Sequence, residues 1–193
     1  MATIIIGLIG KSGAGKDEVA KRLVAEHGYT RLAFADILKD VALAADPVVD
    51  QRIDRASTFG MVDYRLAEAV RDLGWDRAKK IPEVRGFLQR LATAVRDNIG
   101  EDAWVDPVMR RAAEIEGPVV ITDCRYSNEA DAIEASGGAL ARVVRPGQHG
   151  LEGAAAQHAS ETALDNREVE FQIMNDRTIR QLHTEVDALI EAV

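Results

Sequence analysis

The stretch GLIGKSGAGKDEVAKRL, residues 7–23, follows the apolar start MATIII and decides the fold class. It matches the phosphate-binding pattern G-x-x-x-x-G-K-[ST], except that Asp17 stands where a hydroxyl side chain is expected. Glycines allow tight turns whose backbone N–H groups point at phosphate oxygens, and the helix that follows adds a favourable dipole. We predict an ATP-binding loop made of Gly10, Lys11, Ser12, Gly13, Ala14, Gly15, Lys16 and Asp17.

The rest of the chain alternates between strand-like and helix-like segments. Short apolar runs predict five parallel strands, at residues 3–9, 30–35, 117–123, 138–145 and 169–174. Apolar residues at helical spacing predict helices at 16–26, 36–44, 61–73, 83–97, 102–115, 127–135 and 177–192. This pattern predicts a three-layer α/β fold with a parallel sheet flanked by helices, in which ligands bind at the carboxyl ends of the strands.

The length of 193 residues suits a single domain. We expect its core at residues 1–44 and 117–193, with a largely helical insertion at about 45–116. A segment rich in glycine and alanine at 146–164 is long enough to form a short lid over a substrate.

Charge and composition exclude several functional classes. The net charge of −8 and the pI near 5.1 argue against binding to a nucleic-acid polymer, so an anionic substrate requires a local cationic pocket. Cys124 is the only cysteine, so no intrachain disulfide forms, and we interpret it as a small buried apolar residue. MATIIIGLIG is too short to span a bilayer and lacks the features of a signal peptide. We therefore expect a cytoplasmic protein without a membrane partner.

Two carboxylates are candidate ligands for Mg²⁺. Asp17 is a hard oxygen donor directly behind the loop lysine, although an aspartate there also favours the helix dipole without any metal. Asp123 follows the apolar run VVIT, a position from which an acidic residue can reach Mg²⁺ or its water shell. Aspartate also commonly ends strands in turns, so a structural role is the alternative.

Five blocks of sequence carry a family resemblance. GKSGAGKD (10–17), FADILKD (34–40), FLQRLATAVR (87–96), TDCRYSNE (122–129) and HASETALD…NDRT (158–178) resemble the bacteriophage deoxynucleoside monophosphate kinases. In that family an aspartate after the loop lysine looks like the normal pattern. The resemblance implies the P-loop fold of nucleoside monophosphate kinases, with a helical insertion that binds the monophosphate. It also implies the reaction ATP plus dNMP giving ADP plus dNDP, with Mg²⁺, in the host cytoplasm if the protein is phage-encoded.

Phosphoryl transfer needs cations around the transferred group, and arginine binds phosphate through its planar fork. We expect Lys16 and Arg125 to be catalytic, with Arg125 bridging the donor and acceptor phosphates, unless it forms only a surface ion pair. Most kinases of the resembling type carry several cations in the lid, but residues 146–166 contain no lysine or arginine. Either a flanking arginine, Arg142, Arg145 or Arg167, supplies this charge, or Arg125 carries more of it.

The remaining candidates for binding the deoxynucleotide are less specific. Helical spacing places Gln89 and Arg96 near one face. The resemblance implies that this helix faces the monophosphate, with Gln89 addressing the base or sugar and Arg96 the phosphate. Each candidate also has a structural alternative: a solvated helix face, a core tryptophan, or a helix cap. The full predicted set is Lys39, Gln89, Arg96, Trp104, Arg125, Tyr126, Glu129, Ser160 and Glu161.

Two other functions remain open from the sequence. Phosphomevalonate kinases of the animal type look distantly similar, since they share the aspartate-bearing loop, an Asp-x-Arg strand end and a Ser-Glu near the C-terminus. A kinase of the same fold for another small phosphorylated metabolite, such as phosphomevalonate or dephospho-coenzyme A, is therefore an alternative. A nucleotide-binding regulatory module would carry the loop without phosphoryl transfer. The sequence also leaves open whether the chain forms a homodimer.

Overall fold

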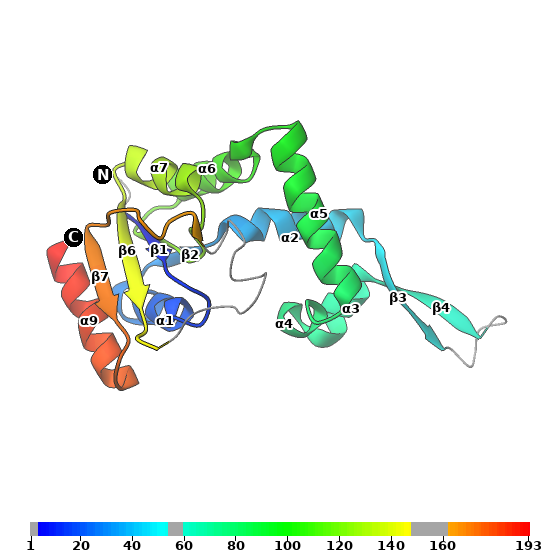
Figure 1. Ribbon diagram of the computed structural model, residues 1–193, viewed down its shortest axis with the longest axis horizontal. Coiled ribbons are helices and arrows are strands. Elements are labelled where there is room, and N and C mark those ends of the chain that lie inside the picture. Colours follow the sequence, from blue (N-terminus) through cyan, green and yellow to red (C-terminus); the bar gives the residue numbers. More distant parts are fainter. Residues whose placement is uncertain (1–3, 54–59, 148–161) are drawn as a thin grey trace. The chain divides into compact units, whose positions relative to one another are not determined.

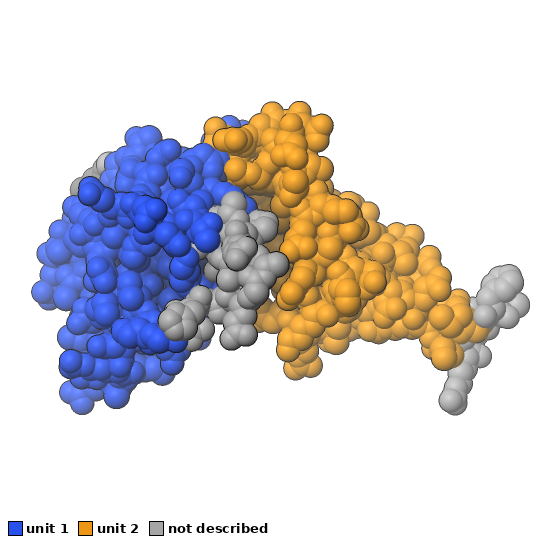
Figure 2. Space-filling model, viewed as in Figure 1, with its two compact units in different colours: residues 1–34, 105–193 blue, residues 35–104 orange. Residues whose placement is uncertain are grey.

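The computed structural model describes residues 4–53, 60–147 and 162–193 (Figure 1). The chain forms two compact units, one of residues 1–34 and 105–193 and one of residues 35–104 (Figure 2). The second unit begins and ends earlier than the insertion predicted at 45–116. Most of helix α2 (Phe34–Ala45) belongs to it, whereas helix α6 (Val105–Glu114) packs on α7 (Ser127–Ala135) in the first unit.

The first unit contains a parallel sheet whose described strands follow the order β2-β5-β1-β6-β7. Every pairing between neighbouring strands is parallel, as predicted. All five predicted strands are confirmed with shorter bounds: β1 (Ile5–Ile9), β2 (Thr30–Leu32), β5 (Val119–Ile121), β6 (Ala139–Val144) and β7 (Phe171–Met174).

Helices cover both faces of this sheet, which explains why β1 is apolar at every position. Side chains alternate between the faces of a strand. Ile6 and Leu8 pack in one cluster with residues of α1 (Lys16–His27) and α9 (Ile179–Ala192). The opposite face meets α7, where Ile133 lies so close to Gly7 that a Cβ there would be 2.6 Å from its Cδ1. Parallel strands buried on both faces are the expected result of such packing.

The second unit has its own apolar core. After α2, the chain of the second unit forms two strands, β3 (Val48–Ile53) and β4 (Met61–Arg65). Three helices come next, α3 (Leu66–Leu73), α4 (Trp75–Ala78) and α5 (Pro82–Asn98), and then a 3₁₀ turn at Glu101–Ala103. The buried residues of this core include Ala42, Val49, Tyr64, Leu66, Val84 and Leu88.

The helix predicted at 61–73 is wrong in its first part. Residues 61–65 form β4, which pairs antiparallel with β3, and the sequence had indicated neither strand. Tyr64 explains the choice, because its buried ring lies 3.1 Å under the Arg52 guanidinium and its hydroxyl donates to Asp72 Oδ2 at 3.1 Å. The contact with Arg52 across the hairpin and the hydrogen bond to Asp72 of α3 outweigh a spacing of apolar residues that also fits a helix.

Among the described residues, none of the helices combines the length and apolar character that a membrane span requires.

An ion-pair cluster joins α1 to α9. The Arg22 guanidinium donates to both carboxylate oxygens of Asp187, at 3.0 and 2.9 Å, and His27 Nε2 lies 2.7 Å from Oδ1. Hydrogen bonds from Arg22, and next from His27, lower the pKa of Asp187 to about 2. A carboxylate with a depressed pKa stabilises the folded state above its unfolded pKa, and this contribution disappears as the pH falls through the folded pKa.

We predict that Asp187→Asn lowers the melting temperature at pH 7 by about 2–4 °C, which corresponds to about 1 kcal/mol for a partly exposed pair. The difference from the wild type should shrink between about pH 4 and pH 2, because the wild-type carboxylate is protonated there. Differential scanning fluorimetry from pH 7 down to pH 2 measures the difference in melting temperature between the wild type and the variant. Glu185→Gln, an exposed change on the same helix, is the control, and an equal loss in both variants would contradict the prediction.

Candidate active site

The loop from Gly10 to Gly15 connects the end of β1 to the start of α1, as the motif predicts. Gly10, Gly13 and Gly15 have φ angles of 141°, 78° and 107°, a region that other residues rarely adopt. The Ala14 N–H donates to Lys11 O at 3.1 Å, which closes a turn, and the N–H groups of Glu18 and Val19 donate to Gly15 O. The loop therefore delivers the chain directly into the positive end of a helix.

The loop is in close contact with β6 at Gly10 and with Asn175, which follows β7, at Gly15. A Cβ at Gly10 would lie 2.4 Å from the backbone oxygen of Val143 in β6, and one at Gly15 would lie 2.4 Å from Asn175 Nδ2. Asn175 follows β7; its backbone N–H donates to Val144 O and its side chain donates to Ala14 O, each at 2.8 Å. Sequence reasoning did not assign Asn175 a role in holding the loop. The only signal was its place in the NDRT block directly behind a predicted strand.

Lys16 is folded over the start of its own loop. Its ammonium group donates to Gly10 O at 2.6 Å and to Lys11 O at 3.0 Å, in a partly buried position. The charge is thus held beside the turn whose N–H groups and helix N-terminus attract anions.

The two predicted metal ligands follow the adjacent strands β1 and β5 in the chain. Asp17 lies in the first turn of α1, and Asp123 lies just past β5, whose Ile121 is level with Gly7 of β1. Asp123 Oδ1 also accepts a hydrogen bond from the Phe34 N–H at 2.7 Å, so this carboxylate fixes the start of α2.

This donor set fits Mg²⁺, which is usually bound by one or two carboxylates together with substrate phosphates. In the ranges that the structure describes, no group of three or more histidine, cysteine, aspartate or glutamate side chains gathers as a site formed by protein alone. The metal-binding roles of Asp17 and Asp123 stay predictions.

The turn after β5 is held by Glu129. This side chain is only 6% exposed, and its Oε2 accepts hydrogen bonds from the backbone N–H groups of Arg125 at 2.6 Å and Tyr126 at 3.0 Å. The geometry favours a role in positioning Arg125 over the predicted direct contact of Glu129 with substrate. Arg125 itself lines the cavity described next.

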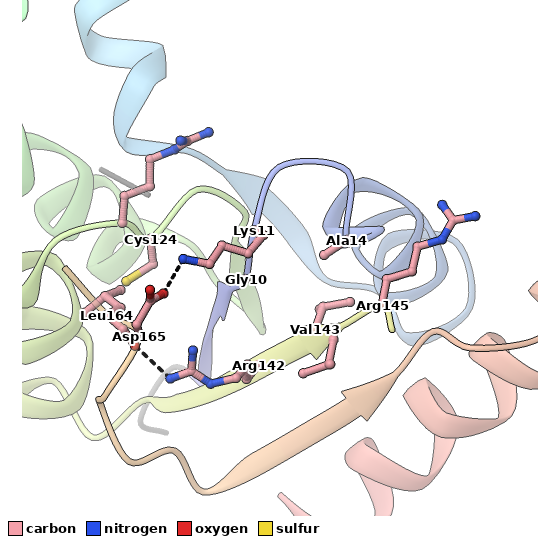
Figure 3. Close-up of a pocket in the computed structure, with 11 residues that line it drawn as sticks. Gly10, Lys11, Ala14, Cys124, Arg142, Val143, Arg145, Leu164 and Asp165 are labelled. Carbon is pink, nitrogen blue, oxygen red and sulfur yellow. Dashed lines mark hydrogen bonds and ion pairs between the residues drawn. The ribbon is translucent and has the colours of Figure 1, made fainter. Parts of the chain in front are cut away.

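A cavity of about 110 Å³ lies beside the loop (Figure 3). Lys11, Arg125, Arg142 and Arg145 contribute positive charges to its lining, and Asp165 contributes one carboxylate. The remaining lining residues are Gly10, Ala14, Cys124, Val143, Val144 and Leu164. In a chain with a net charge of −8, this is the local cationic pocket that an anionic substrate requires.

Leu164 and Asp165 border this cavity, and several polar contacts fix the segment to which they belong. Lys11 Nζ lies 2.5 Å from Asp165 Oδ1. The Arg142 guanidinium donates to the backbone oxygens of Leu164 at 2.9 Å and Arg167 at 2.7 Å. Arg167 in turn pairs with Asp131 at 2.7 Å and Glu134 at 2.6 Å. Two of the three arginines that flank residues 146–166 therefore have structural partners.

The burial of Cys124 agrees with its interpretation as an apolar residue. It is 2% exposed, and burial raises the pKa of its thiol well above the ordinary value, so the thiol is neutral.

Four of the predicted substrate residues belong to the second unit. Lys39 pairs with Asp36 at 2.8 Å. Gln89 lines a groove on α5, to which Arg96 does not contribute; the other lining residues are Arg90, Thr93, Ala94, Asp97 and Asn98. Trp104 is 8% exposed and its indole N–H donates to Ala92 O at 3.2 Å, which favours a packing role over stacking on a base. Substrate contacts of Lys39, Gln89 and Arg96 stay predictions.

Ser160 and Glu161 lie outside the described residues, as does most of the lid predicted at 146–164.

Comparison with known proteins identifies the family. The model of the deoxynucleotide monophosphate kinase family matches residues 48–186. The chain belongs to this family. Because the phosphate-binding loop lies before residue 48, the loop geometry is an independent observation that fits a kinase.

One similar sequence and one similar solved structure add to this comparison. A protein of Acanthamoeba polyphaga mimivirus, provisionally named deoxynucleotide monophosphate kinase, is 26% identical over 197 residues, which cover 97% of this chain and 96% of the viral one. A solved gluconokinase from Sinorhizobium meliloti 1021 matches with a TM-score of 0.53 and 13% identity, over 99% of this chain and 93% of its own. At that identity the likeness shows the fold alone, which is a P-loop kinase fold.

We predict that Gly10→Ala weakens ATP binding at least tenfold and lowers the stability by about 2–4 kcal/mol. The added methyl group meets a backbone oxygen of β6, which cannot move aside as a flexible side chain can. Isothermal titration calorimetry and thermal melting measure the two effects.

Gly137→Ala is the matched control, because Gly137 also has a positive φ of 78° but a Cβ there meets nothing within 4 Å. It should lose about 1 kcal/mol of stability and keep its affinity for ATP. Equal ATP affinities in the two variants would show that the contact with β6 does not shape the loop.

Proposed function

We propose that this kinase transfers the γ-phosphoryl group of ATP to a deoxynucleoside monophosphate, giving ADP and a deoxynucleoside diphosphate. One observation carries the proposal: the loop with Lys16 and the turn with Arg125 follow the adjacent parallel strands β1 and β5, and Arg125 lines a cationic cavity against that loop. Membership of the family supplies the class of acceptor.

The loop and its lysine account for binding of the donor. Backbone N–H groups of residues 10–16 surround the phosphates, apart from that of Ala14, which donates to Lys11 O. The dipole of α1 favours the negative charge of the phosphates. Lys16 exchanges its bonds to Gly10 O and Lys11 O for phosphate oxygens, so its ammonium group moves little on binding. A charge that is already in position loses little free energy to reorganisation during the reaction.

Arg125 accounts for the transfer step. Its backbone is fixed by Glu129, and the residue is among those that line the cavity beside the loop. A guanidinium group there can bind oxygens of the donor and the acceptor together, which holds the two phosphates in line and offsets the charge of the transition state.

Asp17 and Asp123 would hold the Mg²⁺ ion, directly or through water, and the metal would neutralise charge on the β- and γ-phosphates. The acceptor would be bound by Lys39, Gln89 and Arg96 of the second unit and by Tyr126, with Ser160 and Glu161 from the segment outside the described residues. These assignments rest on the sequence resemblance and on the residue chemistry.

We predict ADP release with at least one of the four common dNMPs in an assay coupled to NADH oxidation. In the same assay Lys16→Ala should lose more than a hundredfold in kcat, because the developing charge on the transferred group is no longer compensated. Lys21→Ala is the matched control, since Lys21 lies on α1, is exposed and, among the described residues, forms its ion pair with Glu18.

Absence of turnover with every dNMP, in a protein that still binds ATP, would reject the proposed acceptor. Turnover with phosphomevalonate or dephospho-coenzyme A would then establish one of the alternative kinases. Binding of ATP without transfer to any of these acceptors would establish a regulatory module.

We predict that Asp17→Ser retains activity but needs about tenfold more Mg²⁺ for half-maximal rate, because it replaces a charged oxygen ligand with a neutral one. A magnesium titration at saturating ATP and dNMP measures the shift. Glu18→Gln tests the alternative of a pure dipole effect, since Glu18 lies in the same first turn. An unchanged titration for Asp17→Ser would make Asp17 a structural residue.

A further inference from the structure

Residues 146–166 contain no lysine or arginine, so the positive charge on this side of the donor site must come from elsewhere. Three arginines flank that stretch: Arg142 and Arg145 before it and Arg167 after it. Their charges cannot be distinguished in the sequence, but their surroundings in the structure differ.

Arg142 and Arg167 both form contacts with distant parts of the chain. Arg142 donates to two backbone oxygens, those of Leu164 and Arg167, and so fixes residues 164–167 against the end of β6. The Arg167 side chain is 19% exposed and pairs with two carboxylates of α7, Asp131 and Glu134. Moving the Arg142 guanidinium to a phosphate would leave two backbone oxygens without their donor. Moving that of Arg167 would break its ion pairs with two exposed carboxylates, which is a weaker constraint.

Arg145 is placed differently. It follows the last residue of β6 and is exposed, and within the residues that the structure describes it has no hydrogen bond or ion pair. It lines the same cavity as Gly10, Lys11 and Ala14 of the loop. Figure 3 shows it on the Ala14 side, away from the ion pair between Lys11 and Asp165. A guanidinium group here can bind a polyanion on the loop without breaking a hydrogen bond or ion pair to any of the described residues.

We propose that Arg145 is the arginine that binds the phosphate chain of the donor nucleotide beside the loop. The inference rests on the proposed use of ATP as donor and adds a specific contact to it. Arg145 binds the phosphates through its forked N–H groups, in addition to Lys16. Arg142 acts as a structural residue that keeps the cavity wall in place.

The test measures ATP affinity by isothermal titration calorimetry, without acceptor, at low and at high salt. Arg145→Ala should weaken ATP binding about tenfold or more at low salt, and the gap to the wild type should narrow at high salt, because the lost contact is between charges. Arg145→Lys should recover part of the loss, since lysine keeps the charge but not the fork. Arg110→Ala, an exposed arginine of α6 that does not line the cavity, should leave the affinity unchanged.

Thermal melting distinguishes the proposed binding role of Arg145 from the structural role of Arg142. Arg145→Ala should leave the melting temperature within about 2 °C of the wild type, whereas Arg142→Ala should lower it clearly, because two backbone oxygens lose their donor.

Two results would overturn the inference: an unchanged ATP affinity in Arg145→Ala, or a loss of equal size at both salt concentrations, which would indicate stacking on the base. The proposed function is tested separately by turnover of the wild type. A wild-type protein that transfers no phosphate to dNMPs, but loses ATP affinity in Arg145→Ala, would reject the acceptor and support the arginine.

Discussion

The site depends on the close contact between the loop after β1 and the two strands beyond it. Gly10 approaches the backbone of β6 so closely that no side chain fits, and the amide of Asn175 after β7 holds the opposite end of the loop at Ala14. A phosphate-binding loop works only when its N–H groups are already aimed inward, since ordering them on binding would cost conformational entropy. The parallel sheet supplies this order, because β1 lies between β5 and β6 and all the strands end at the same edge.

The same edge gathers charges that are far apart in the chain. Lys16 follows β1, Arg125 follows β5 and Arg145 follows β6, so adjacent parallel strands bring three cations to one side of an acidic protein. Other polar groups there serve the fold: Glu129 fixes the turn that carries Arg125, and Arg142 fixes the segment that carries Asp165. Residues proposed to bind phosphate and residues that support the fold thus lie in or follow the same strands, and their contacts within the protein distinguish them.

The fold was predictable from sequence where one physical preference dominates. The run at 3–9 is apolar at nearly every position because both faces of β1 are buried, and the helix at 127–135 appears with the bounds expected for it. The sequence failed at 61–65, where Met61, Val62 and Tyr64 suit either a helix or a strand. That choice depended on pairing with residues 48–53 and on the contact between Tyr64 and Arg52, which no local pattern contains.

The sequence by itself determined the loop, its lysine and the α/β class, because glycine conformation, helix dipole and strand burial act over short stretches of chain. Tertiary structure alone decided which candidate side chains form hydrogen bonds within the protein, even among residues of the same type. Glu129 meets the backbone of Arg125, Trp104 is packed against α5, and Arg142 binds two distant carbonyl groups whereas Arg145 does not. Such differences come from contacts between residues separated in sequence, and so they exist only once the chain has folded.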